Sequence, residues 1–211
     1  MISKKELEIL LSGLNKIEKP RPSLEQYTIP SRLAAEILNL AYLSGDLKGK
    51  LVADLGCGSG ILAIGASLFD AKQVVAVDID DDALKTAKEN VELVKALINK
   101  KIKIKFVNSD VSEWGGRVDT VIQNPPFGIQ KEHADRIFLD KALKSARKIY
   151  SLHRSYYKSR DFIEKFVNER NGKVKNIITY KFRIPHMFSF HKKSKVEFDV
   201  DLFVIEVLSW K

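Results

Sequence analysis

The stretch that decides the fold reads Leu51-Val52-Ala53-Asp54-Leu55-Gly56-Cys57-Gly58-Ser59-Gly60. Its first five residues are apolar almost throughout, as expected for a strand that is buried on both faces of a parallel sheet. The alternating glycines that follow let the backbone turn tightly and approach a ligand without a Cβ in the way. The sequence therefore predicts a strand, a glycine turn and then a helix from Ile61 to about Phe69.

An acidic residue after the next strand supports a ligand-binding interpretation of this turn. Asp78 ends the expected strand Gln73–Val77 and lies 20 residues beyond Gly58. That is the usual separation for an acid that binds ribose hydroxyls at the end of the second strand. The turn is not the dinucleotide fingerprint, because Ile61 stands where that fingerprint needs its third glycine. The pair predicts a site for a nucleoside without a pyrophosphate, and a plain strand-to-helix turn is the alternative.

Two further aspartates and the single cysteine lie near the expected site. Asp54 could hold a positively charged group or accept the N–H groups of the turn, and Asp110 could accept a hydrogen bond from an adenine amine. For Asp110 a simple strand-end cap is the alternative. Cys57 has no neighbouring base to activate it, so we interpret it as a small packed residue. One cysteine excludes an internal disulfide and a Cys-based zinc site made by this chain alone, and we expect no metal.

A second strand ends in a stiff polar turn. The apolar run Val118–Gln123 leads into Asn124-Pro125-Pro126-Phe127. The prolines fix φ and bias the turn away from helix, so that the Asn124 side-chain oxygen and the Pro125 carbonyl present two acceptors. An exocyclic amine has two N–H donors to match them, and Phe127 could stack on the base that carries the amine. A stiff turn without function is the alternative, since Asn and Pro are turn formers anyway.

Helices and strands alternate along the whole chain. We expect helices over residues 4–17, 31–44, 61–69, 80–98, 134–147 and 161–169, and strands over 51–55, 73–77, 101–106, 118–123, 148–152, 175–184 and 196–208. This order predicts an α/β fold with a mostly parallel seven-stranded sheet, helices on both faces and a C-terminal antiparallel hairpin. It also places the glycine turn, Asp78, Asp110 and Asn124 at the carboxyl ends of successive strands, which is the edge where such sheets bind ligands.

Composition limits the class of protein further. With 211 residues, 45% hydrophobic and 30% charged, the chain fits one globular α/β domain. No apolar run is long enough to cross a bilayer and no signal peptide is recognisable, so we expect a cytoplasmic protein. The net charge of +9 favours a polyanionic partner such as nucleic acid. A merely basic surface, or adaptation to high temperature, is the alternative.

These motifs resemble those of class I S-adenosylmethionine-dependent methyltransferases that act on exocyclic or amide nitrogens. The chain also resembles a narrower group, the methyltransferase-like protein five family of ribosomal RNA adenine-N6 methyltransferases. This resemblance rests on Leu24-Glu25-Gln26-Tyr27, Tyr150-Ser151-Leu152-His153 and Phe190-His191-Lys192-Lys193, and it covers nearly the whole chain. It implies a Rossmann-like fold and S-adenosyl-L-methionine as the cofactor.

The resemblance also implies a division of the chain and a set of site residues. Residues 1–211 would form one methyltransferase domain, with 1–45 as a helical extension covering the cofactor site and 46–211 as the core. The implied catalytic residues are Asn124, Pro125, Pro126 and Phe127. The implied cofactor residues are Gln26, Thr28, Asp54, Gly56, Gly58, Gly60, Asp78, Ile79, Asp110 and Val111. Because the proline that the family commonly has before Thr28 is missing here, Ile29 competes with Thr28 for its role.

Two further stretches predict contacts with partners. The loop Phe188–Lys195 mixes aromatic and basic residues, so we expect RNA contacts from His191, Lys192, Lys193 and Lys195, with a solvated turn as the alternative. The Lys-Ile alternation over residues 101–106 predicts a half-exposed edge strand, whose lysines would guard against unwanted pairing. The resemblance adds a small zinc-binding activator subunit that extends the sheet at the edge strand over residues 101–107.

The function expected from this reasoning is methyl transfer to the exocyclic N6 of an adenosine in small-subunit ribosomal RNA. A protein-glutamine N5-methyltransferase is the nearest alternative, since a glutamine amide offers the same NH2 group. Those enzymes usually end the motif in Tyr where this chain has Phe127. A small-molecule nitrogen methyltransferase is a further enzymatic alternative. An RNA-binding ribosome assembly factor is the non-enzymatic one, and the intact Asn124 motif argues against it.

Overall fold

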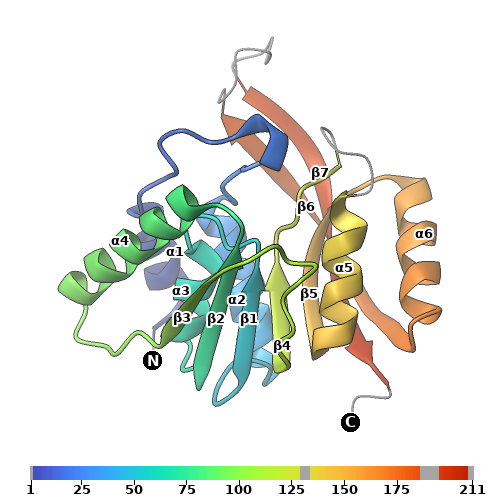
Figure 1. Cartoon of the computed structure of the whole chain (residues 1–211), viewed down its shortest axis with the longest axis horizontal. Helices are drawn as coiled ribbons and strands as arrows, with labels where there is room; N and C mark the ends of the chain where they lie inside the picture. The colour runs from blue at the N-terminus through green and yellow to red at the C-terminus, as the bar shows by residue number, and fades with distance from the viewer. Residues whose placement is uncertain (1, 129–133, 186–194, 209–211) are drawn as a thin grey trace.

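The computed structural model describes residues 2–128, 134–185 and 195–208 (Figure 1). Its helical elements are α1 (Lys4–Ser12), the 3₁₀ turn η1 (Pro22–Leu24), α2 (Ser31–Leu43), α3 (Ile61–Leu68), α4 (Asp81–Leu97), α5 (Ala134–Ser145) and α6 (Tyr157–Asn168). Its strands are β1 (Leu51–Leu55), β2 (Gln73–Asp78), β3 (Ile104–Asn108), β4 (Val118–Gln123), β5 (Ala146–Arg154), β6 (Gly172–Pro185) and β7 (Lys195–Val207).

The strands form one sheet of seven in the order β3-β2-β1-β4-β5-β7-β6. The first five run parallel to one another, whereas β7 pairs antiparallel with β5 and with β6. This confirms the predicted fold class. The register sets Leu55 of β1 beside Gln123 of β4. The glycine turn and the Asn-Pro-Pro turn therefore leave the sheet at neighbouring positions of its carboxyl rim.

Each inner strand buries side chains on both faces of the sheet. Val52 joins the apolar layer with residues of α1 to α4, whereas Ala53 and Leu55 join the layer with residues of α5 and α6. Successive strand side chains point to opposite faces, so an apolar run such as residues 51–55 requires helices on both sides. This double cover leaves the two rims of the sheet as the places where polar groups can gather.

α1 is shorter than its apolar spacing predicts. The helix ends at Ser12, with Gly13 at its C-cap, so Leu14 and Ile17 lie in the loop that follows. Ile17 is nevertheless buried. The helix does not continue through Gly13 because glycine is a poor helix former. Apolar residues nevertheless recur at helical spacing beyond Gly13, because the loop that follows still covers the core.

Other boundaries also differ from the prediction: α6 begins at Tyr157 instead of residue 161, and β6 begins at Gly172 instead of residue 175. The helix expected over residues 134–147 ends at Ser145, and the buried Ala146 already pairs with Val118 as the start of β5. No glycine or proline separates this helix from the strand, so nothing in the composition marks the change. β3 lies over residues 104–108 instead of 101–106, and it is the edge strand, as predicted.

The segment between α1 and α2 crosses the carboxyl rim of the sheet. We refer to residues 18–30 as the strap; it is the dark-blue segment that passes above the inner strands in Figure 1. Arg21 of the strap reaches Asp82 at the start of α4, and Glu25 reaches Phe127 after β4. The strap thus spans from the β2–α4 side of the rim to the β4 side. Across the described ranges, no helix is both long and apolar enough to cross a membrane.

Candidate active site

The glycine turn after β1 needs glycine for conformation and for space. Gly56, Gly58 and Gly60 have φ values of 70°, 53° and 82°, in the left-handed region that other residues rarely adopt. A Cβ on Gly56 would lie 2.8 Å from Cε1 of Phe138, and one on Gly60 would lie 3.0 Å from Cβ of Ala87. The turn therefore keeps its backbone close both to the α5 side chain and to α4.

Two buried carboxylates lie beside this turn. Asp78 Oδ2 accepts the N–H of Gly58 at 2.8 Å, and its Oδ1 accepts the N–H of Asp80 at 3.0 Å. Asp54 Oδ2 accepts the N–H of Ala63, in the first turn of α3, at 2.9 Å. Burial raises the pKa of Asp78 above its ordinary value, although the N–H groups of Asp80 and Gly58 oppose this. Both acids thus shape the turn, as the sequence allowed for Asp54.

The second oxygen of Asp54 has no hydrogen-bond partner within the described ranges, although it is fully buried. Burial raises the pKa of Asp54 to about 8, the N–H of Ala63 opposes this, and the negative charge of Asp78 adds to it. A buried carboxylate oxygen without a donor is costly. A cationic ligand group placed against it would remove that cost. The methionine ammonium of S-adenosylmethionine fits this requirement.

The turn after β4 holds its asparagine in one orientation. Asn124 Nδ2 donates to the carbonyl oxygen of Tyr27 at 3.3 Å, and the backbone N–H of Phe127 donates to Oε2 of Glu25 at 2.7 Å. The Asn124 side-chain oxygen is buried and has no partner among the described residues. The strap therefore takes up the amide donors of this turn and leaves an acceptor for a ligand N–H.

Gln26 lies between Glu25 and Tyr27 in the strap, and it binds the start of α4 on the opposite side of the rim. Gln26 Nε2 donates to Asp80 Oδ2 at 2.7 Å, while its Oε1 accepts the N–H of Arg21 at 2.6 Å. Arg21 Nη2 lies 3.3 Å from Asp80 Oδ1, and Asp80 is almost fully buried at the N-cap of α4. Successive strap residues thus fasten the β4 turn and the start of α4 to each other.

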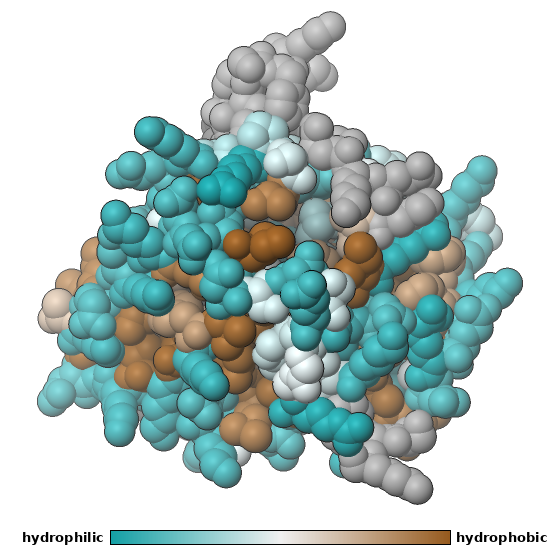
Figure 2. Space-filling view, in the orientation of Figure 1, coloured by the Kyte–Doolittle hydropathy of each residue, from teal (hydrophilic) through white to brown (hydrophobic). Residues whose placement is uncertain are grey.

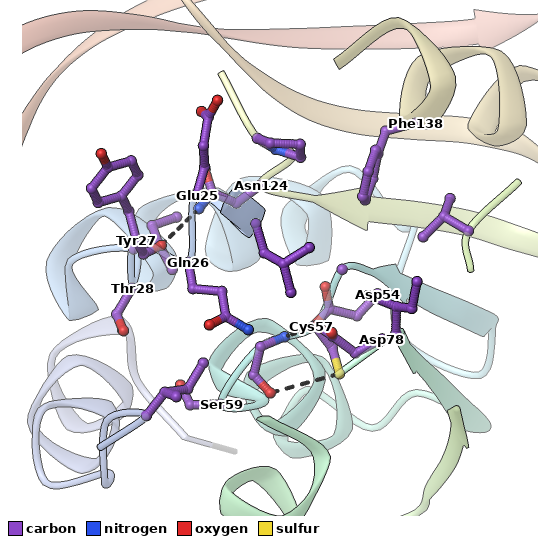
Figure 3. A pocket seen from close by; sticks show the side chains of 18 of the residues that line it. Glu25, Gln26, Tyr27, Thr28, Asp54, Cys57, Ser59, Asp78, Asn124 and Phe138 are labelled. Carbon is purple, nitrogen blue, oxygen red and sulfur yellow. Dashed lines mark hydrogen bonds between the residues drawn. The ribbon is translucent and has the colours of Figure 1, made fainter. Parts of the chain in front are cut away.

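These elements enclose one cavity of about 210 Å³. It brings together Gln26, Thr28, Asp54, Gly56, Gly58, Asp78, Ile79, Asp110, Val111, Asn124 and Pro126 from the predicted set. The other predicted residues of the two turns, Gly60, Pro125 and Phe127, do not line it. Figure 3 shows Asp54, Cys57 and Asp78 gathered on one side, and Glu25, Tyr27 and Asn124 on the other. Thr28 and Ile29 both line the cavity.

Several lining residues were not singled out from the sequence. Ile17 comes from the segment before α2, and Ala134, Ile137 and Phe138 come from α5. Phe138 is only partly buried and lies against Gly56. Glu25 and Tyr27 were noted only as part of the stretch that carries the family resemblance. Their contacts with the Asn124 turn join residues about a hundred positions apart, for which a single sequence contains no signal.

Part of the cavity lining is exposed to solvent. Ile79 is 51% exposed and Ile137 is 42% exposed, although both line the cavity. Figure 2 shows apolar and near-neutral residues exposed in the middle of a largely hydrophilic face. Asp110 is exposed, and its Oδ1 accepts from the backbone N–H and hydroxyl of Ser112, both at 2.7 Å. A flat apolar ligand group such as adenine would cover the exposed isoleucines.

Phe127 packs in an aromatic cluster beside the cavity. Its ring lies edge-on to those of Phe182 and Phe198, each at 5.6 Å between centroids. Phe182 and Phe198 stack on one another at 5.5 Å. The ring of Phe127 is therefore fixed from the side of β6 and β7, and it stays half-buried. Phe127 joins this aromatic cluster to the Asn124 turn.

Other predicted residues have simpler outcomes. Cys57 is buried, and burial followed by the charges of Asp54 and Asp78 raises the pKa of its thiol well above the ordinary value, which disfavours the reactive thiolate. Of the predicted RNA-contacting residues, His191, Lys192 and Lys193 lie outside the described residues, as does the side chain of Lys195. In the part of the chain that the structure describes, no group of three or more His, Cys, Asp or Glu could hold a metal ion.

The sheet order, the glycine turn and the carboxylates of Asp54 within β1 and Asp78 at the end of β2 define a class I methyltransferase. A crystal structure of PH1948 from Pyrococcus horikoshii, a candidate RNA methyltransferase, superimposes with a TM-score of 0.90, 44% identity and 99% coverage of both chains. Magnesium protoporphyrin IX methyltransferase from Synechocystis with bound S-adenosylmethionine shares the fold, with a TM-score of 0.64 at 20% identity over 83% of this chain and 78% of that chain. A family model for ribosomal protein L11 methyltransferase (PrmA) matches residues 34–127.

The sequence comparison narrows this class. METTL5 from Danio rerio, named an rRNA N(6)-adenosine-methyltransferase, is 39% identical over 204 residues that cover 93% of this chain and 95% of that protein. The chain belongs to the METTL5 family of rRNA N(6)-adenosine methyltransferases, which are S-adenosyl-L-methionine-dependent enzymes.

Proposed function

We propose that this chain methylates the exocyclic N6 of an adenosine in ribosomal RNA, with small-subunit RNA as the substrate. The observation that carries the proposal is the buried side-chain oxygen of Asn124, which has no partner among the described residues and shares a cavity with the glycine turn. An exocyclic amine supplies the N–H that this oxygen lacks. Family membership and the net charge of +9 support RNA as the carrier of that amine.

The role of these residues is to orient the adenine amine for methyl transfer. The lone pair of an adenine amine is delocalised into the ring, so the nitrogen is a poor nucleophile. Accepting its two protons at Asn124 Oδ1 and at the Pro125 carbonyl would favour a pyramidal nitrogen with its lone pair directed into the cavity. S-adenosylmethionine supplies an electrophilic methyl group when bound. The chain then acts by positioning and electrostatics without a general base.

The same proposal assigns the cofactor residues. Asp54 would hold the methionine ammonium and Asp78 the ribose hydroxyls, while the glycine turn leaves room for the methionine part. Ile79, Val111 and Asp110 would contact adenine. Residues 1–45 would act as the cover and 46–211 as the core of one domain. The contacts of Gln26 with Asp80 and of Glu25 with Phe127 support a cover that reaches both sides of the cavity.

Nucleoside mass spectrometry tests the reaction. Ribosomal RNA from the two subunits is incubated with isotope-labelled cofactor, and we expect label in N6-methyladenosine from the small-subunit RNA. Asn124→Ala should lower turnover by about a thousandfold or more with near-normal cofactor binding. Asn168→Ala, at the exposed end of α6, is the matched control. Label in glutamine, in a parallel incubation with ribosomal protein, would favour the rival enzyme, and cofactor binding without any labelled product would refute the assignment.

We also propose that the loop including His191, Lys192, Lys193 and Lys195 contacts RNA. The support is its composition, since basic and aromatic residues suit phosphate contacts and base stacking. Filter binding of RNA across a salt series tests it with the Lys192→Ala, Lys193→Ala double variant. Loss of two phosphate contacts should reduce the salt slope by about two. An unchanged slope would favour a solvated turn.

A small zinc-binding activator subunit is the partner that the resemblance implies. β3 supports this, because it is the edge strand and, within the described ranges, pairs only with β2. The partner would add a strand along Ile104–Asn108. Hydrogen exchange tests it: amides of β3 should gain protection when the subunit is added, while those of the opposite edge strand β6 should not. Equal protection at both edges would contradict strand addition.

A further inference from the structure

An arginine at the carboxyl end of β5 has no part in the site described so far. Arg154 is half-buried, and no carboxylate of the described residues lies within ion-pair distance of its guanidinium. Arg147, at the other end of the same strand, pairs with Glu206 at 3.5 Å. Arg160, on the neighbouring helix, pairs with the buried Asp201 at 2.6 Å. Arg147 and Arg160 are therefore each paired with an acid, whereas Arg154 is not paired with any acid of the described residues.

Aromatic rings hold the guanidinium in place instead of an acid. Arg154 Cζ lies over the ring of Tyr156 at 4.9 Å and over that of Phe198 at 5.1 Å, measured to the centroids. A guanidinium stacked on rings keeps its N–H donors at its edges, because these point along its own plane. The arrangement orders the side chain and still leaves a donor fork for a planar or tetrahedral anion.

This group lies next to the catalytic turn. The Phe198 ring under Arg154 is in edge contact with Phe127 at 5.6 Å. The charge of Arg154 also acts on the hydroxyl of Tyr27, whose backbone carbonyl holds Asn124. β4 and β5 run parallel with Gln123 beside Ser151, so both strands deliver these residues to the same rim. A phosphate bound by Arg154 would thus lie within a nucleotide or so of a base at Asn124.

We propose that Arg154, clamped by Tyr156 and Phe198, binds a backbone phosphate of the RNA strand beside the target adenosine. The exposed ring of Tyr156 then offers a stacking surface to an adjoining base. The proposal rests on the proposed function, because it takes RNA as the substrate.

The exposure of neighbouring residues fits a single-stranded segment. Tyr156 is 52% exposed and Tyr157 is 82% exposed, and Lys158 follows them on the surface. Exposed rings interleaved with cations suit bases and phosphates in alternation. A target base that leaves its stack needs its neighbours to be held, and a fixed arginine fork does this at low entropic cost.

The experiment measures RNA affinity by fluorescence anisotropy at several salt concentrations, on the full chain and independently of turnover. A labelled single-stranded RNA oligonucleotide containing adenosine is the probe. The variants are Arg154→Gln, Arg154→Lys and, as the matched control on the same strand, Arg147→Gln. We expect Arg154→Gln to weaken binding about five- to twentyfold at low salt and to reduce the salt slope by about one. Arg154→Lys should keep the slope with weaker binding, and Arg147→Gln should change neither.

Three outcomes would overturn the proposal. The first is an Arg154→Gln protein that keeps the wild-type slope and affinity. The second is equal losses in Arg154→Gln and Arg147→Gln, which would indicate a general charge effect. The third is loss of cofactor affinity or of the melting transition in both Arg154 variants, which would indicate a structural role. If the wild-type chain binds RNA through Arg154 but methylates none, the proposed function fails while the phosphate site stands.

Discussion

The two ends of β1 each carry a glycine in the left-handed region, and only one of them serves the cavity. Gly49, before the strand, has φ 73°, is exposed, and has nothing within 4 Å of where a Cβ would be. Gly56, after the strand, has φ 70°, and a Cβ there would meet Phe138 at 2.8 Å. The φ angle is nearly the same at both glycines. What distinguishes a binding turn is the space around it, which the residue type alone does not reveal.

Polar groups at the two rims differ in the same way. At the carboxyl rim, Asp54 and Asn124 each keep a buried oxygen without a partner among the described residues. At the amino rim, Asp119 accepts the N–H of Leu51 at 2.7 Å. Glu206 there lies 3.2 Å from Lys148. An unpaired buried acceptor costs stability and persists where a ligand completes it. We therefore propose that the unpaired oxygens of Asp54 and Asn124 are completed by a ligand, whereas the paired groups of the amino rim stabilise the fold.

The largest expected effect is on cofactor affinity, and it tests the comparison of the two glycines by replacing each of them with alanine. Gly56→Ala should weaken S-adenosylmethionine binding by about a hundredfold or more, because strain and the clash with Phe138 combine at that position. Gly49→Ala should leave the affinity within about twofold and cost only about 1–2 kcal/mol of stability from its positive φ. Isothermal titration calorimetry and thermal melting measure the two quantities. Similar losses of affinity in both variants would mean that the turns differ in position only.

The next largest effect is expected at the strap. Glu25→Ala removes the acceptor for the Phe127 N–H, so the Asn124 turn should loosen and kcat should fall about ten- to a hundredfold. Cofactor affinity should change less than threefold. Glu25→Gln keeps an acceptor oxygen and should recover most of the rate.

Glu206→Gln is the matched control for the strap variants, since this acid is paired at the amino rim. It should leave kcat unchanged. Single-turnover methyl transfer with saturating RNA gives the rates. If Glu25→Ala raised only the cofactor Kd, the strap would act as a cover for the cofactor and not as a support for the Asn124 turn.

How far the sequence predicted the fold depends on what ends each element. β1 and β4 were located residue for residue because apolar runs stop at glycine or at Asn-Pro-Pro. The start of β5 was missed because α5 passes into it at Ala146 without any breaker. α1 was overextended because the loop after Gly13 still buries Ile17. A helix or strand boundary can be predicted where a glycine, proline or asparagine ends the element. Where no such residue is present, tertiary packing determines the boundary.

The site shows the same division. The residues at the carboxyl ends of β1, β2 and β4 could be placed at one rim from strand order alone, and Gly56, Asp78 and Asn124 among them line one cavity. The roles of Glu25 and Arg154 could not be predicted, because each depends on a contact across the fold. Glu25 binds the Phe127 N–H, and Arg154 stacks on Phe198 of β7. A salt bridge or helix cap between residues that are close in sequence can be recognised from their spacing. A contact between residues that are far apart in sequence cannot.

A smaller effect is expected on the pH dependence of stability. Burial raises the pKa of Asp54 from 3.8 to about 8 in the folded chain. The folded state then holds a proton that the unfolded state loses, so this contribution is present below about pH 4 and is lost as the pH rises towards 8. Asp54→Asn has no such loss. Its melting temperature relative to wild type should therefore rise from pH 5 to pH 8.5, by an amount equivalent to about 1–3 kcal/mol.

Thermal melting of the ligand-free proteins across this pH range gives the difference. Asp119→Asn is the control at the amino rim, where the carboxylate is exposed and accepts the N–H of Leu51. Its difference from wild type should stay flat between pH 5 and pH 8.5. A flat profile for Asp54→Asn as well would show that the Asp54 carboxyl is ionised throughout, and the unpaired oxygen would then carry its charge without a ligand.

The smallest effect is expected from a hydroxyl that joins β5 to the turn before β1. Tyr150 Oη donates to Asp46 Oδ2 at 2.7 Å, and the ring is fully buried. Tyr150→Phe removes this bond and keeps the ring, while Asp46 retains access to water because it is only half-buried. The loss should be about 1 kcal/mol, or about 2–4 °C in melting temperature for a chain of this size. Cofactor affinity and kcat should be unchanged, since every partner of this hydroxyl is already in the chain. A drop in cofactor affinity would mean that the paired groups also support the cavity, and the separation between the rims would fail.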